Sequence, residues 1–307
     1  MKAVIICGPT GAGKSSLALN LAQKFKGVII NADSVQIYRE IKILSGRPTS
    51  DDYRQAPHRL YGIMSIFKPC TLGIWRKMAL ETIKECELSG HVPIICGGTG
   101  LYIKFLLNEL SAIPDIPRSI KLEAREKLEE LGNENFRELL SKNDPVSACR
   151  IKSGDTNRLL RAWEVLTATT KPLSYWHEQS RDTGTQHEYF KVCLVPKRET
   201  LYSKCDKRFL DFVEQGAIEE ARALNFITAS PELPASKTLG LLELIKYTKG
   251  ELELSDAIEQ AQRTTRRYAK RQLTWFRHQL DEDFLIQNLS CSKTVSDCFK
   301  KIMNFLG

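Results

Sequence analysis

Residues 8–15 read Gly-Pro-Thr-Gly-Ala-Gly-Lys-Ser, and this segment restricts the fold more than any other part of the chain. It matches the G-x-x-x-x-G-K-[ST] pattern of a phosphate-binding loop. The apolar run Ala3–Cys7 before it predicts a buried strand, and Lys14–Phe25 after it predicts a helix. Because the pattern is meaningful only between a strand and a helix, this context predicts an α/β fold with a P-loop NTPase-like parallel sheet.

The expected chemistry of this loop is the binding of a diphosphate or triphosphate. Its glycines let successive backbone N–H groups point toward an anion, and the following helix adds positive potential at its N-terminus. Lys14 supplies a positive charge, and the Ser15 hydroxyl is a ligand that Mg²⁺ accepts beside a phosphate, so Mg²⁺ is the expected cofactor. The predicted anion site consists of Gly8, Pro9, Thr10, Gly11, Ala12, Gly13, Lys14 and Ser15.

Further apolar runs predict more strands of the same sheet, at Gly27–Asn31, Val92–Cys96 and Phe190–Val195. Helical periodicity near 74–89 and from Arg198 onward predicts helices on both faces of the sheet. Between Pro114 and Trp176 the pattern is that of charged amphipathic helices. We therefore expect a P-loop core at 1–116 and 178–307, a helical insertion at 117–177 and a mostly helical C-terminal part.

Composition excludes several classes of protein. Hydrophobic residues make up 42% and charged residues 27%, a mixture that buries a core. No apolar run approaches the ~18–20 residues of a membrane span, and no secretion signal is recognisable, so we expect a cytoplasmic protein without a membrane partner. The 9 cysteines include no C-x-x-C pair, which argues against a disulfide framework or a zinc site. The net charge of +8 permits a polyanionic partner.

A carboxylate follows the second predicted strand, in the segment Asp33-Ser34-Val35-Gln36-Ile37-Tyr38. Ligands bind at the carboxyl edge of open α/β sheets, so Asp33 is expected there as a general base or as a Mg²⁺ partner. The structural alternative is an aspartate that caps the next turn. Gln36 carries an amide donor and an acceptor, the pair that reads an adenine edge.

The strand at Val92–Cys96 ends in a second glycine-rich turn, Gly97-Gly98-Thr99-Gly100. It brings the Thr99 hydroxyl to the same sheet edge, although a plain tight turn is the simpler interpretation. The chain shows no apolar strand closed by a Walker-B aspartate and no N-K-x-D motif, so a GTPase or a motor ATPase is not expected.

Two sets of basic residues are candidates for phosphate contacts. Arg158 and Arg161 are three residues apart and share a helix face. The segment Arg263–Arg277 contains six basic residues within an arc of roughly 140°, beside an apolar stripe. Tyr268 and Trp275 flank this arc, as is typical of a helix that binds a nucleic-acid backbone. In both cases the alternative is an ordinary solvated face.

Together these segments resemble the tRNA dimethylallyltransferases, P-loop prenyltransferases that modify the adenosine directly 3′ of the anticodon, in their compact bacterial form. The resemblance rests on Gly8–Ser15, Asp33–Tyr38, Gly97–Tyr102, Asn157–Ala162 with Glu164 and Val165, and Thr265–Arg277.

The resemblance implies that the loop holds the diphosphate of dimethylallyl diphosphate, and that the exocyclic amine of a flipped adenine attacks the allylic carbon. It implies Asp33 and Thr99 as catalytic residues, an insertion that lies against the anticodon stem of tRNA, and a monomer. The implied tRNA-binding residues are Asp33, Ser34, Val35, Gln36, Thr99, Lys121, Asn157, Arg158, Arg161, Lys237, Arg267 and Lys270.

Two other functions are compatible with parts of the sequence. A small-molecule or nucleotide kinase shares the phosphate loop and uses lid arginines, a role open to Arg158 and Arg161. A non-catalytic RNA-binding module would account for the basic helix, but it has no need of Lys14, Ser15 and Asp33 at converging strand ends.

Overall fold

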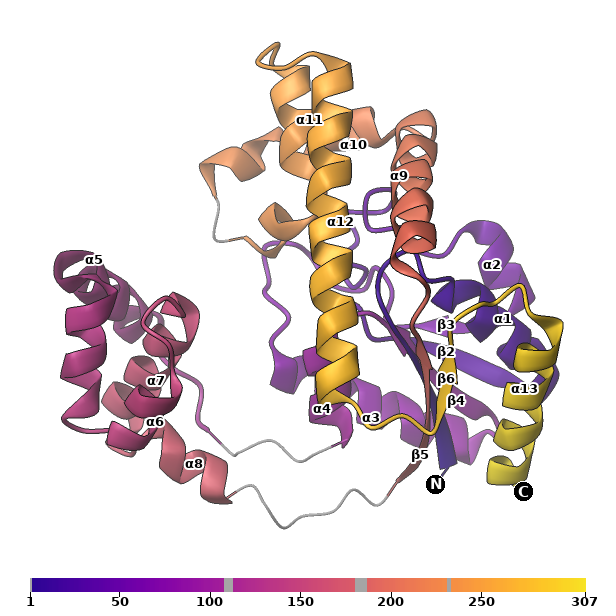
Figure 1. Ribbon diagram of the computed structural model, residues 1–307, viewed down its shortest axis with the longest axis horizontal. Helices are drawn as coiled ribbons and strands as arrows, with labels where there is room; N and C mark the ends of the chain where they lie inside the picture. Colours follow the sequence, from indigo (N-terminus) through magenta and orange to yellow (C-terminus); the bar gives the residue numbers. More distant parts are fainter. Residues whose placement is uncertain (1, 108–112, 180–186, 231–232) are drawn as a thin grey trace. The chain divides into compact units, whose positions relative to one another are not determined.

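The computed structural model describes residues 2–107, 113–179, 187–230 and 233–307. Within these residues six parallel strands form one sheet in the order β3-β2-β4-β1-β5-β6 (Figure 1). The strands are β1 (Lys2–Cys7), β2 (Gly27–Asn31), β3 (His58–Arg59), β4 (Val92–Gly97), β5 (Glu188–Leu194) and β6 (Phe284–Ile286). The four strands predicted from apolar runs are all present, and the parallel P-loop-like sheet is confirmed.

The two edge strands, β3 and β6, were not predicted. β3 has two residues and β6 has three, so neither is long enough to show an apolar period of its own. Their pairing is set by neighbours distant in sequence, with Ile29 beside His58 and Cys193 beside Leu285.

Helices cover both faces of the sheet. Val4 and Ile6 of β1 pack into a core with α1 (Lys14–Phe25) and α13 (Ser292–Leu306). Ala3 and Ile5, which point to the opposite face, join a second core with α3 (Leu72–Leu88), α4 (Gly100–Leu107) and α12 (Leu254–Gln279). The prediction that helices cover both faces of the sheet is therefore confirmed, because alternate residues of β1 pack into two different cores.

The C-terminal part is mostly helical. After β5 come α9 (Arg198–Glu214), α10 (Ala217–Ala223), two short 3₁₀ helices, η1 (Asn225–Ala229) and η2 (Pro234–Lys237), and α11 (Leu241–Thr248). The long helix α12 packs against both α9 and α11 (Figure 1). The apolar stripe predicted on α12 is buried, since Ala269, Leu273, Phe276 and the capping Leu280 are at most 9% exposed. A short helix, α2 (Ser50–Gln55), follows the second strand in the chain.

The chain divides into two compact units, residues 1–107 with 186–307, and residues 108–185. The second unit contains α5 (Arg118–Ser141), α6 (Pro145–Arg150), α7 (Thr156–Thr169) and α8 (Leu173–Gln179). α5 is two helical segments that meet at Gly132, whose φ of 72° is not helical. The unit has its own core around Phe136, Leu140, Leu159 and Val165, and no strand is found among its described residues.

Candidate active site

The predicted phosphate loop connects β1 to α1. Gly11 and Gly13 adopt φ values of +77° and +92°, which side chains other than glycine rarely tolerate, so the loop depends on these two glycines for its curvature. The Lys14 ammonium lies inside this curve and donates to the carbonyl oxygen of Pro9 at 2.8 Å. Burial lowers the pKa of Lys14 from its usual value, and the Arg208 charge acts in the same direction, while Asp33 opposes both. Lys14 thus places a positive charge inside a loop that is partly shielded from water.

All three polar groups of Thr10 are bonded to the C-terminal helices. Its N–H donates to Oε1 of Gln272 at 2.8 Å, and its hydroxyl accepts from Nη1 of Arg208 at 3.2 Å. Its carbonyl oxygen accepts from the Cys205 thiol at 3.6 Å, and burial raises the pKa of that thiol to about 11, so it keeps its proton. Hydrogen bonds with α9 and α12 therefore fix the position of Thr10 in the phosphate loop.

A cleft of about 730 Å³ opens beside the loop. The loop side of the cleft presents Gly11, Gly13, Lys14 and Ser15. The other lining residues include the cations Lys42, Arg47, Lys204 and Arg208, together with the apolar side chains of Ile43 and Phe212. Such a lining suits an anion that carries a small apolar group.

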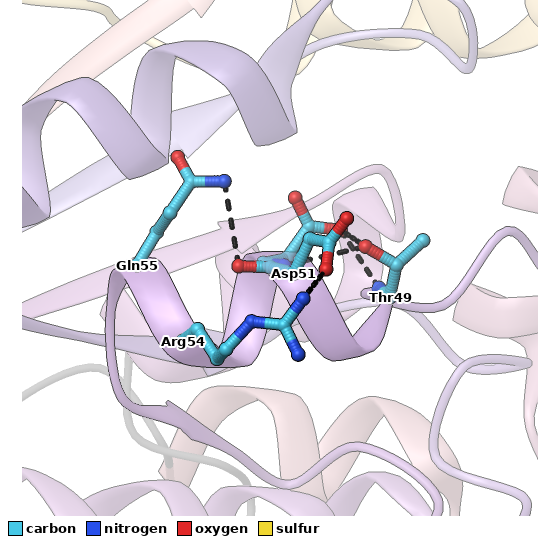
Figure 2. Close-up of polar contacts among 5 residues, drawn as sticks. Thr49, Asp51, Arg54 and Gln55 are labelled. Atoms are coloured by element: carbon cyan, nitrogen blue, oxygen red, sulfur yellow. Dashed lines mark hydrogen bonds and ion pairs between the residues drawn. The ribbon is translucent and has the colours of Figure 1, made fainter.

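The acid of this lining, Asp51, belongs to α2 and is paired with Arg54 of the same helix (Figure 2). Gln55 donates to the Asp51 carbonyl oxygen, and Thr49 caps the helix through Asp52. Because Asp51 is already paired, its charge is partly screened from the cations of the cleft.

One acceptor and one donor hold residues 42–46, the loop that lines one side of the cleft. The Glu220 carboxylate of α10 accepts the backbone N–H groups of Lys42, Ile43 and Leu44 at 2.6–2.8 Å. Nε2 of Gln36 donates to the carbonyl oxygens of Ser45 and Gly46 at 3.0 and 2.8 Å. These two bonds occupy the amide nitrogen of Gln36, so in this conformation its Oε1 is the atom left to contact a base.

Asp33 is held in place by Asn31, which is fully buried at the end of β2. Oδ1 of Asn31 accepts the Asp33 N–H at 2.8 Å, and its amide nitrogen donates to the carbonyl oxygens of Asp33 and Leu60, each at 3.0 Å. Trp75 in turn donates to the Asn31 carbonyl oxygen at 2.8 Å. This network fixes the backbone from which the Asp33 carboxylate projects.

The Asp33 carboxylate has one oxygen engaged and one available. Oδ1 accepts from the backbone N–H groups of Val35 and Gln36 at 2.9 and 3.4 Å, the turn-capping role considered from the sequence. Among the described residues, hydrogen bonds reach only Oδ1. Burial raises the pKa of Tyr268 and the Asp33 charge adds to that effect, which puts Asp33 within electrostatic reach of α12. Capping thus occupies Oδ1, and Oδ2 accepts no hydrogen bond from the described residues.

Thr99 lies beside Ser34, as their positions at neighbouring strand ends predict. Oγ1 of Thr99 accepts the Ser34 N–H at 3.0 Å and donates to the Ser34 hydroxyl at 3.3 Å. The Thr99 N–H donates to the carbonyl oxygen of Ala32 at 3.2 Å. Hydrogen bonds thus connect the loop after β2 with the loop after β4 at Ser34, the residue next to Asp33.

The basic face of α12 is exposed, with one exception. Arg267 and Lys270 are exposed and have no ion pair among the described residues. Arg266 instead turns toward α9 and forms an ion pair with Asp206 at 2.6 Å, so it is not part of the outward basic surface that the sequence predicted. Arg263 pairs with Glu259 at 2.8 Å, and Lys237 is exposed at the end of η2.

The second unit carries its own basic surface. Lys121 of α5 and Asn157, Arg158 and Arg161 of α7 are exposed. Burial raises the pKa of Glu164, and the charges of Arg161, Lys121 and Arg125 oppose this shift. Two of the predicted tRNA-binding residues, Lys121 and Arg161, therefore gather around one half-buried carboxylate across α5 and α7, whereas Arg158 pairs with Asp155 at 3.2 Å.

Several residues of the site were not singled out from the sequence, among them Arg208, Glu220 and Gln272. Arg208 and Glu220 lie in charged helical segments where nothing local distinguishes them from solvated neighbours. Gln272 lies inside the basic segment, on the face of the apolar stripe. A glutamine on an otherwise apolar face was the sequence signal that could have identified it.

No helix among the described residues has the length and hydropathy needed to cross a membrane. The same residues contain no group of three or more His, Cys, Asp or Glu side chains arranged to hold a metal ion.

Comparisons with known proteins show which family this chain belongs to. The IPP transferase family model matches residues 36–279, and an isopentenyl transferase model matches residues 1–65. The tRNA dimethylallyltransferase of Paramagnetospirillum magneticum is 42% identical over 99% of this chain and 96% of its own length. The tRNA dimethylallyltransferase of Rhodospirillum centenum is 43% identical over 90% and 88%.

Two solved structures cover 99% of this chain. The crystal structure of the tRNA isopentenylpyrophosphate transferase from Bacillus halodurans matches with a TM-score of 0.70 and 28% identity over 96% of its own chain. A eukaryotic dimethylallyltransferase acting on tRNA matches with a TM-score of 0.85 and 27% identity over 78% of its own chain. These relatives do not favour the kinase alternative. The chain belongs to the tRNA dimethylallyltransferase family of prenyltransferases.

Proposed function

We propose that this protein transfers the dimethylallyl group of dimethylallyl diphosphate to the exocyclic amine of the adenosine 3′-adjacent to the anticodon in tRNA, releasing diphosphate. The observation that carries this proposal is the convergence of Lys14 and Arg208 on the phosphate loop, within electrostatic reach of Asp33. A leaving anion and a proton acceptor are the two groups that this substitution requires.

The reaction forms one bond and breaks one bond. The adenine amine attacks the allylic carbon, and the carbon–oxygen bond to the diphosphate breaks with its electron pair on the diphosphate. Lys14, Arg208 and the loop N–H groups stabilise that developing charge. Oδ2 of Asp33 accepts the amine proton, a contribution of ~10²–10⁴-fold for a well-placed general base. Thr99 lines the adenine side of the site, next to Ser34.

We propose Mg²⁺ as the cofactor, because the Ser15 hydroxyl belongs to the lining of the cleft. That donor set fits a cation held mainly by diphosphate oxygens and water, with one hydroxyl from the protein. When bound, the ion would neutralise charge on the diphosphate. The remaining steps depend on the residues described above.

We propose tRNA as the macromolecular substrate, with phosphate contacts from two basic surfaces. Arg267, Lys270 and Lys237 belong to the first unit, and Lys121, Asn157, Arg158 and Arg161 belong to the insertion, which would lie against the anticodon stem. Residues 33–36 and Thr99 would contact the flipped adenosine. We also propose that the protein acts as a monomer in the cytoplasm.

The test is a transfer assay with two labels. Purified protein is incubated with unmodified tRNA and either allyl-labelled dimethylallyl diphosphate or γ-labelled ATP, and the tRNA is digested to nucleosides. We expect the allyl label on one adenosine, only in tRNAs with adenosine 3′ of the anticodon. Transfer of the γ-phosphate to any acceptor, without allyl transfer, would support the kinase alternative instead.

A further inference from the structure

Gln272 is a buried polar residue on a buried helix face. Its exposure is 7%, and it lies between Ala269, Leu273 and Phe276, which are all buried. Burying an amide is unfavourable unless both of its ends form hydrogen bonds. The partners of these two hydrogen bonds therefore indicate why a glutamine occupies this position.

Both ends of the Gln272 amide bind backbone groups of loops at the carboxyl edge of the sheet. Oε1 accepts the Thr10 N–H at 2.8 Å, and Nε2 donates to the Gly98 carbonyl oxygen at 2.7 Å. Thr10 follows β1 and Gly98 follows β4, and these two strands are neighbours in the sheet. One side chain thus bridges the phosphate loop and the loop that carries Thr99.

Packing around Gly98 shows how closely these parts approach one another. A Cβ atom at Gly98 would lie 2.6 Å from Nε2 of Gln272, 3.3 Å from the Gly8 carbonyl oxygen and 3.5 Å from the Lys14 ammonium. The Gln272 bridge therefore lies close to both the Lys14 ammonium and the loop that carries Thr99. Thr99 in turn bonds to Ser34, next to Asp33.

We propose that Gln272 is a positioning residue that holds the diphosphate loop at a fixed separation from the loops of Thr99 and Asp33. This inference rests on the proposed function, because the separation aligns the allylic carbon with the adenine amine. Gln272 does not touch the reacting atoms. A displacement of about 1 Å in such an alignment costs on the order of 10²-fold in rate.

The chemistry of the bridge requires one acceptor and one donor on the same side chain. A glutamate at this position would still accept from Thr10, but it would present a second oxygen to the Gly98 carbonyl. A methionine has nearly the same length and forms neither bond with comparable strength. Gln279 provides a matched control, since it lies on the same helix, is exposed and accepts from the Lys104 ammonium at 3.0 Å.

The experiment is single-turnover transfer with enzyme in excess over tRNA and with saturating dimethylallyl diphosphate, for the wild type, Gln272→Glu, Gln272→Met and Gln279→Ala. The amplitude reports the fraction of tRNA that is converted, the rate constant reports alignment, and thermal unfolding of each variant reports whether it is folded. Titrations with inorganic diphosphate and with tRNA measure binding separately. We expect both Gln272 variants to lower the rate constant by about 10–100-fold. We expect tRNA affinity within about threefold of the wild type and an unchanged rate constant for Gln279→Ala.

Rate constants close to wild type in the Gln272 variants, with or without a lower amplitude, would overturn the proposal and leave Gln272 with a structural role only. If Gln272→Glu does not fold, Gln272→Met decides between these outcomes. A wild-type protein that forms no prenylated tRNA would instead refute the proposed function, so the two failures are distinguishable.

Discussion

Arg208 provides the sharpest test of the proposal that the cleft binds the diphosphate. Its guanidinium donates to the Thr10 hydroxyl at 3.2 Å and stacks over Phe212 at 5.0 Å from the ring centroid. Burial lowers the pKa of Arg208, with Asp33 opposing the shift, but an arginine stays charged at neutral pH. The side chain is thus a fixed positive charge beside the phosphate loop.

The expected loss on removing this charge follows from its geometry. A hydrogen bond to a charged group contributes about 1.5–3 kcal/mol, which is about 10–150-fold in kcat/KM for the allyl donor. Arg208→Ala is expected to show that loss, and Arg208→Lys a smaller one, because lysine keeps the charge but loses the planar donor pair and the stacking on Phe212. Lys207→Ala is the matched control, since its exposed side chain carries the same charge on the same helix and is not among the lining residues of the cleft.

The assay is steady-state transfer at varied donor concentration, with thermal unfolding of each variant measured in parallel. If Arg208→Ala keeps kcat/KM within about threefold of Lys207→Ala at equal stability, the assignment of Arg208 to the diphosphate is wrong.

Three further predictions concern other parts of the molecule. Lys14→Ala should lower turnover by at least about 10²-fold while tRNA affinity changes little, as measured by single-turnover rates and tRNA titration; an equal loss of tRNA binding would contradict it. Neutralising Arg267 and Lys270 should reduce the slope of log Kd for tRNA against log salt by about one per lost phosphate contact, and an unchanged slope would mean that this face is only solvated. Burial raises the pKa of Asp144, but hydrogen bonds from Ser147 and Ser174 outweigh it and bring the pKa below its usual value. A carboxyl group whose pKa is lowered on folding stabilises the fold at pH values above its unfolded pKa of about 3.9. Asp144→Asn should therefore lower the free energy of unfolding by about 1–2 kcal/mol at pH 7. Chemical denaturation should show that this difference shrinks as the pH falls below about 3.9.

The parts of the fold that were predicted are those with local causes. The helix at Lys14–Phe25 follows a glycine turn and ends at Lys26, which adopts a left-handed conformation before Gly27. The strand at Gly27–Asn31 contains an apolar run of three residues, Val28–Ile30, between Gly27 and Asn31, so both ends were readable. Strand β5 was expected at 190–195 and lies at Glu188–Leu194, because its pairing with β1 begins at Lys2 beside Glu188.

The parts that were missed depend on contacts between distant residues. Arg208 reaches Thr10 across 198 positions of the chain, and Gln272 reaches the same residue across 262. Neither contact leaves a periodic signal in the surrounding helix. The same cause explains Arg266, which was grouped with the exposed basic residues but pairs with Asp206 on α9. For Gln36, the sequence indicated its chemistry, but only the structure showed that its amide nitrogen binds the loop at 45–46.

We propose that the anion loop and Asp33 form one site in which Asp33 takes the amine proton. The most direct measurement is the single-turnover rate of allyl transfer for Asp33→Asn across pH, beside the wild type. Asparagine keeps the shape of Asp33 and an oxygen to accept from the Val35 and Gln36 N–H groups, but it is not a base. We predict a rate lower by ~10²–10⁴-fold, with inorganic diphosphate and tRNA affinities within a few-fold of the wild type. A near-normal rate at every pH would contradict the claim and leave Asp33 as a turn cap.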